Sequence, residues 1–177
     1  MAEIIDGYTL VLVGRLALSF QRYPESEAGL GATPRSHGAL PVALTALGRA
    51  ILPLAAGEAM WIGLSPAWEG AQCRVAWAPL KKSTADCRLP RLLVSSFRPI
   101  FGLRSANGQF SALIRETSSH GAVPCSGVIM LAVATDSAER ERLQIQFIDP
   151  RAFEAQSGRA APGPLSPGDA YGGWHLP

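Results

Sequence analysis

Residues 128–148 read VIMLAVATDSAERERLQIQFI, and this stretch decides the fold class of the chain. Its first part, Val128–Ala134, is wholly apolar, which predicts a strand at the centre of a sheet because neither face offers polar groups to water. After a polar turn, large apolar residues alternate with glutamines at Leu143, Ile145 and Phe147, as in a strand with one buried face. The two segments predict an antiparallel hairpin, with the half-polar arm closer to the rim of the sheet.

Strand signals continue upstream of this hairpin. Alternating leucines in Thr9–Arg22 predict a half-buried strand that bends at Gly14. Two further strands are expected over Ala59–Ser65 and Ala71–Trp77, joined by a turn at Pro66–Gly70. The inward-facing residues of the second of these are expected to be Cys73, Val75 and Trp77.

A second hairpin is expected between Phe101–Arg104 and Phe110–Arg115. The dipeptide Asn107-Gly108 lies between these segments, and both residues tolerate the positive φ angles of a tight hairpin turn. Another short strand is expected over Leu92–Phe97, and Pro99 has to lie at an edge or a bend since it donates no backbone hydrogen bond.

One helix is expected, over Leu40–Leu54. Its large aliphatic residues recur at helical spacing, Pro41 suits a first turn and Pro53 would end the helix. Gly48 weakens the pattern, and two short strands are the alternative. The preceding segment, Tyr23–Ala39, is rich in proline, glycine and small polar residues and is expected to form a long loop.

The chain is therefore expected to be mainly β: an antiparallel β-sandwich or a partly open barrel of about eight strands, with at most one or two short helices. An α+β arrangement is the second possibility. Residues 1–155 are assigned to a single globular domain. Residues 156–177 are assigned to a tail that docks on this domain or on a neighbour, because Tyr171 and Trp174 give a Pro/Gly-rich segment apolar anchors.

The amino-acid composition limits the classes of partner and the location that we expect for the protein. Of the 177 residues 47% are hydrophobic and only 17% are charged, which indicates either a large core or an apolar patch that a partner covers. The 16 basic and 14 acidic residues are scattered, so no nucleic-acid partner is expected. No apolar run approaches the roughly 18 residues of a membrane helix, and the acidic start does not resemble a secretory signal. Three cysteines without a CxxC spacing favour reduced thiols and a cytoplasmic location.

Catalytic and metal-binding signals are weak. Glu116, His120 and Cys125 bring a carboxylate, an imidazole and a thiol into one loop, the set that a cysteine nucleophile requires. A structural cysteine beside a solvated histidine explains the same residues more simply, so no catalytic residue, metal site or cofactor is assigned. Glu58 and Glu69, at the two ends of the 59–65 strand, are interpreted as solvating groups beside turns.

The aromatic residues carry the functional hypothesis. Trp68 lies in a turn, where an exposed ring would present a flat apolar face to a ligand, and Tyr171 and Trp174 lie in the tail. We therefore expect a non-catalytic binding or assembly module that engages a protein partner or a second copy of itself. A small cysteine-dependent enzyme using Cys125 and His120 is the first alternative, and a carbohydrate-binding β-sandwich using Trp68 is the second.

Overall fold

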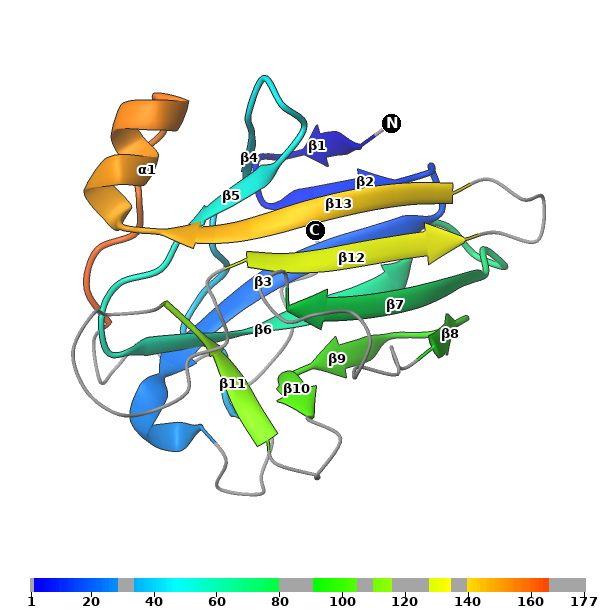
Figure 1. The fold of residues 1–177 in the computed structure, drawn as a ribbon, viewed down its shortest axis with the longest axis horizontal. Coiled ribbons are helices and arrows are strands. Elements are labelled where there is room, and N and C mark those ends of the chain that lie inside the picture. Colours follow the sequence, from blue (N-terminus) through cyan, green and yellow to red (C-terminus); the bar gives the residue numbers. More distant parts are fainter. Residues whose placement is uncertain are drawn as a thin grey trace.

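The computed structural model describes residues 2–28, 34–79, 91–104, 110–115, 128–134 and 140–165. These residues form two β-sheets that face each other, with one α-helix at the side, on the left in Figure 1. The protein is a mainly β, predominantly antiparallel sandwich, as the sequence predicts.

The first sheet has seven strands and centres on the long pair β3 and β6. Six strands follow in the spatial order β1-β2-β3-β6-β11-β10, and β9 also pairs with β6. Their bounds are β1 Glu3–Ile5, β2 Thr9–Leu12, β3 Leu16–Pro24, β6 Glu58–Pro66, β9 Arg98–Ile100, β10 Gly102–Arg104 and β11 Phe110–Ile114. All pairs in this sheet are antiparallel.

The second sheet has six strands in the spatial order β4-β5-β13-β12-β7-β8. Their bounds are β4 Ala43–Leu44, β5 Ala50–Pro53, β7 Cys73–Pro79, β8 Arg91–Val94, β12 Val128–Ala134 and β13 Arg140–Ile148. The pair β5 and β13 is parallel, while the other pairs are antiparallel. Outside the sheets lie a 3-10 turn η1, Glu25–Glu27, and the helix α1, Pro150–Ser157.

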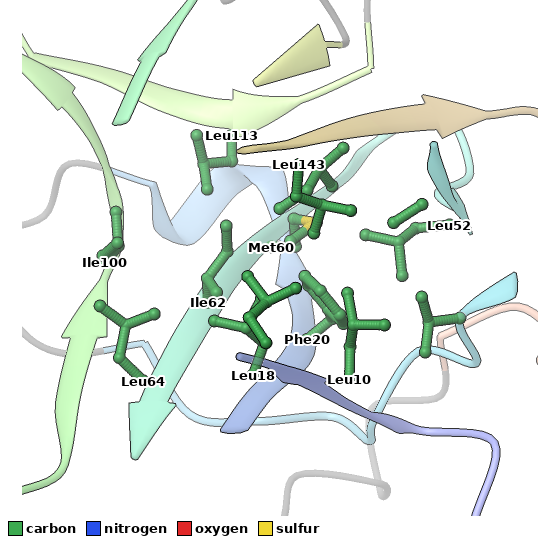
Figure 2. Close-up of a cluster of buried hydrophobic side chains, with 14 of the residues drawn as sticks. Leu10, Leu18, Phe20, Leu52, Met60, Ile62, Leu64, Ile100, Leu113 and Leu143 are labelled. Carbon is green, nitrogen blue, oxygen red and sulfur yellow. The ribbon is translucent and has the colours of Figure 1, made fainter. Parts of the chain in front are cut away.

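The core lies between the inner faces of the two sheets. Leu18, Phe20 and Ile62 contribute from the first sheet, and Figure 2 shows them beside Leu52 and Leu143 of the second. These side chains are almost completely buried, and their burial supplies the main driving force for packing the two sheets together. The outer face of the second sheet has a smaller cluster of its own, which forms where α1 packs.

The 128–148 hairpin is confirmed as β12 and β13. Val128–Ala134 lies in the interior of the second sheet, with β13 on one side and β7 on the other, as expected. The expectation that the half-polar arm lies nearer the rim is wrong, because β13 itself lies between β12 and β5. Its polar residues do not mark an edge, since they only face away from the core.

The helix expected over Leu40–Leu54 is wrong. The segment forms the two short strands β4 and β5, which is the alternative that Gly48 had favoured. Gly48 adopts a positive φ of 70° in the turn between them. The segment forms strands because pairing with β13 buries Ala50 and Leu52 in the shared core. The free energy of this burial outweighs the local helical propensity.

The strand expected over Thr9–Arg22 is two strands. A tight turn at Val13 and Gly14 reverses the chain, so that β2 pairs with β3. The loop expected over Tyr23–Ala39 is shorter than predicted, because Ala39 forms a bridge with Gln21 at the edge of β3.

The turn expected at Pro66–Gly70 does not close a hairpin. It carries the chain from β6 of the first sheet to β7 of the second, a crossing that local sequence does not encode. The hairpin expected around Asn107-Gly108 is confirmed by the pairing of β10 with β11, although the dipeptide itself lies outside the described residues.

The helix α1 was not expected, yet its ends follow standard capping rules. The carboxylate of Asp149 accepts a hydrogen bond from the backbone N–H of Arg151, and Pro150 occupies the first turn. Gly158 ends the helix in the left-handed region, with φ of 69°. Phe153 anchors the helix in the cluster with Ile51 and Ile148, so the domain boundary drawn at residue 155 falls inside a helix.

We predict that the two faces of β13 respond very differently to truncation. Ile145→Ala removes a fully buried side chain and should lower the free energy of unfolding by about 2–5 kcal/mol. Gln144→Ala, on the opposite face of the same strand, should change it by less than about 0.5 kcal/mol. Urea unfolding followed by circular dichroism measures both values, and equal losses would contradict the assignment of faces.

Candidate functional site

A strained turn marks one end of the sandwich, on the right in Figure 1, where β2 passes into β3. The backbone N–H of Arg15 donates to the carbonyl of Leu12 at 3.0 Å, and both residues between them have positive φ, 47° at Val13 and 62° at Gly14. Asn-Gly is preferred in turns of this kind. A β-branched residue in the left-handed region is strained, and such strain clusters at functional sites.

Contacts from both sheets hold this turn in place. The backbone N–H of Val13 donates to a carboxylate oxygen of Glu141, at the start of β13, at 2.9 Å. The backbone N–H of Ala67, just after β6, donates to the carbonyl of Arg15 at 2.8 Å. The turn is therefore tied to the second sheet on one side and to the β6–β7 connection on the other.

Trp68 lies against this turn and remains 51% exposed. Its indole N–H donates to the carbonyl of Gly14 at 3.1 Å, and the guanidinium carbon of Arg15 lies 5.5 Å from the ring centroid. The second contact is a cation–π interaction. Both contacts restrict the ring, so the side chain is exposed and also held in one orientation.

We refer to Val13, Gly14, Arg15 and Trp68 together as the tryptophan end. Chemically it offers a flat apolar ring beside a delocalised cation, on backbone that the contacts above make rigid. Such a surface suits a ligand that carries an apolar group next to a carbonyl or carboxylate oxygen.

Cys73, at the start of β7, is 2% exposed. Burial raises the pKa of the thiol from 9.0 to about 11, and the charge of nearby Arg15 lowers it by a smaller amount. The thiol therefore stays neutral at ordinary pH and acts as a core side chain, as the sequence predicts for the inward face of this strand.

The opposite end of the sandwich holds a buried ion pair. Arg22 on β3 and Glu58 on β6 are 7% and 5% exposed, and a guanidinium N–H donates to the carboxylate at 3.1 Å. The second carboxylate oxygen accepts from the backbone N–H of Ala55 at 3.2 Å. The interpretation of Glu58 as a solvating group is therefore wrong, because β6 extends through it and turns its side chain inward, whereas Glu69 is exposed as expected.

A second polar group lies along the edge of β3. The hydroxyl of Ser36 donates to the side-chain oxygen of Gln21 at 2.6 Å, and both residues are buried. His37 is buried too, and its Nδ1 has no hydrogen-bond partner within the described part of the chain. The sequence predicted a loop at this histidine, since nothing local shows that residues 36–40 pair with β3.

Of the three residues assigned to ligand or partner binding from sequence, Trp68 is the one that the structure places. Tyr171, Trp174, Glu116, His120 and Cys125 lie outside the described residues, and the predictions made for them stay predictions. Across residues 2–28, 34–79 and the later described segments, no three His, Cys, Asp or Glu residues gather as metal ligands. In the same residues no helix has the length and apolar character needed to cross a membrane.

The contact of Arg15 with Trp68 and the hydrogen bond from Val13 to Glu141 were not expected from the sequence. One signal was present, because the dipeptide Val13-Gly14 interrupts an alternating pattern at the point where a hairpin would turn. The contact with Glu141 had no signal, since it joins residues 128 positions apart.

The chain matches no protein-family model, no curated protein and no solved structure.

We predict that Val13→Asn stabilises the protein. Asparagine tolerates the left-handed region, so the substitution relieves backbone strain and should raise the free energy of unfolding by about 1 kcal/mol. Thermal and urea unfolding measure the change. Loss of stability would mean that the valine side chain makes contacts worth more than the strain.

We predict that Cys73 resists alkylation in the native protein. At pH 8 the Cys73 peptide should stay unmodified by iodoacetamide, whereas the same peptide from urea-unfolded protein should be modified, as peptide mass mapping can show. The sign of the pKa shift also implies that stability falls between about pH 9 and pH 11, because the unfolded thiol loses its proton first. Cys73→Ala should reduce this slope, and an unchanged slope would contradict the assignment.

Proposed function

We propose that this protein is a non-catalytic binding module that engages a protein surface through the tryptophan end, with a second copy of the chain as the simplest partner. The observation that carries the proposal is the state of Trp68, which is half exposed and yet held by a hydrogen bond and a cation–π contact. A large ring in this state is ready to be buried by a partner.

Energetic considerations favour an interface at this end. Tryptophan and arginine are enriched among the residues that dominate binding energy, and here they touch each other. Immobilising a flexible side chain at an interface costs about 0.5–1.5 kcal/mol, and most of that cost for Trp68 is already met within the free protein. The strained turn beneath it supports the same conclusion, because strain is retained where a fixed geometry is useful.

Ligand chemistry favours a protein over a neutral sugar. Arg15 places a positive charge over the ring, so the ligand meets a cation beside the aromatic face. A protein surface readily supplies an apolar side chain next to a carboxylate or carbonyl. Stacking of a sugar on Trp68 remains the second candidate, because the ring is exposed. The tail residues Tyr171 and Trp174 remain predicted contributors to the interface.

We predict that Trp68→Ala weakens self-association at least tenfold. Sedimentation velocity over a wide concentration range gives the association constant of the wild-type protein and of each variant. Tyr8→Ala is the matched control, because Tyr8 is 46% exposed but belongs to the turn between β1 and β2, and it should leave the constant unchanged.

Two outcomes would contradict this proposal. Equal effects of the two substitutions would show that the tryptophan end is not the interface, and a wild-type chain that stays monomeric at every concentration would rule out self-association. In the second case, tryptophan fluorescence titrated with a glycan panel tests the sugar candidate, which requires a response that Trp68→Ala abolishes.

A further inference from the structure

A short segment after α1 returns to the first sheet. Residues 158–165, with the sequence GRAAPGPL, are called the strap here. The strap leaves the helix at Gly158, whose left-handed backbone redirects the chain, and it contains no helix or strand. It lies at the end of the molecule that holds the buried ion pair, away from the tryptophan end.

The first anchor of the strap is Arg159. Its guanidinium donates to the backbone carbonyl of Val42 and lies directly on Gly7. A Cβ atom at position 7 would collide with the guanidinium, so Arg159 would have to move its flexible side chain away from residue 7. The backbone N–H of Val42 in turn donates to the carbonyl of Gly7 at 3.0 Å, so the two residues that contact the arginine are bonded to each other.

The second anchor is Arg22, in the buried ion pair. The guanidinium nitrogen that donates to Glu58 also donates to the carbonyl of Gly163 at 2.6 Å. The Nε of Arg22 is buried and has no partner among the described residues. The strap thus supplies an acceptor to a buried cation whose hydrogen-bonding capacity is not fully used.

The apolar contribution of the strap is small by comparison. Ala161 packs against the cluster beneath α1, where Phe153 is the large anchor. Local hydrogen bonds join the strap to α1, from the N–H of Arg159 to Ser157 and from the N–H of Ala161 to Glu154. Within the described part of the chain, its hydrogen bonds to the rest of the domain are the two from arginines to backbone carbonyls. Contacts of this kind reform equally well when the same segment comes from another chain.

We propose that the seat formed by Gly7, Arg22 and Val42 is a second interaction surface, and that it takes the strap of another copy of this chain. The seat fits this sequence in particular, because Gly7 leaves room for an arginine and Arg22 meets a carbonyl four residues later. The strap of the same chain occupies the seat at high effective concentration, so exchange is suppressed until the strap is loosened. This surface does not depend on Trp68.

Two complementary variants test the exchange. Arg159→Ala loosens the strap but keeps the seat, while Gly7→Ala displaces the guanidinium from its place on residue 7 but keeps Arg159. Both are made in a Trp68→Ala background, which removes the tryptophan end from the measurement. Mixed together they should form a heterodimer by native mass spectrometry, at least ten times more abundant than either homodimer.

Matched controls separate exchange from general destabilisation. Gly48→Ala replaces Gly7→Ala in one mixture, because Gly48 has a similar positive φ of 70° and open space around its Cβ position. Arg151→Ala replaces Arg159→Ala in another, since Arg151 is an exposed arginine on α1. Neither control mixture should enrich the heterodimer.

A peptide measurement covers the case in which Gly7→Ala does not fold. Fluorescein-labelled GRAAPGPL should bind the Arg159→Ala protein at least tenfold more tightly than it binds the wild-type protein, and GAAAPGPL should not bind. No heterodimer from folded variants, enrichment in the control mixtures, or equal binding of the two peptides would each overturn the proposal.

Discussion

The pairing of β3 with β6 is the constraint on which the rest of the structure depends. Nine residues of each strand pair without interruption, from Leu16 opposite Pro66 to Pro24 opposite Glu58. This register turns Phe20 and Ile62 toward the core together. It also sets the positions of the tryptophan end and of the seat of the strap, which lie at opposite ends of the strand pair. A shift by one residue would turn every inward side chain outward, so the core holds the register firmly.

The two ends of this strand pair differ in character. At one end, the register sets the start of β3 beside the connection after β6, and so brings Arg15 against the ring of Trp68. At the other end it sets Arg22 one diagonal step from Glu58, on the inner face. The first end leaves an ordered aromatic ring in water, whereas the second buries two charges that need each other. Removing one partner of such a pair costs about 3–5 kcal/mol, so the ion pair ties the strap's seat to the stability of the sheet.

Both candidate surfaces use backbone that ordinary residues avoid. Val13 is held in the left-handed region beneath Trp68, and Gly7 leaves the space that the guanidinium of Arg159 fills. Valine is poorly suited to its conformation at position 13, where Glu141 of the other sheet binds its N–H. Glycine is well suited to position 7, where Arg159 packs against it. Departures from local preference of this kind are expected where a surface has a task besides folding.

Local sequence patterns are sufficient to predict the fold class, the central position of Val128–Ala134 and the pairings β10–β11 and β12–β13, because alternation of apolar residues and turn chemistry act over a few neighbours. The caps of α1, Asp149-Pro150 and Gly158, are local signals of the same kind. By contrast, local patterns do not show that residues 40–54 contain two strands or that β6 and β7 belong to different sheets. The tertiary structure alone decides that Glu58 is buried and that Glu141 reaches Val13. These outcomes depend on contacts between distant segments, and the free energy of such contacts outweighs the local preferences that a sequence pattern displays.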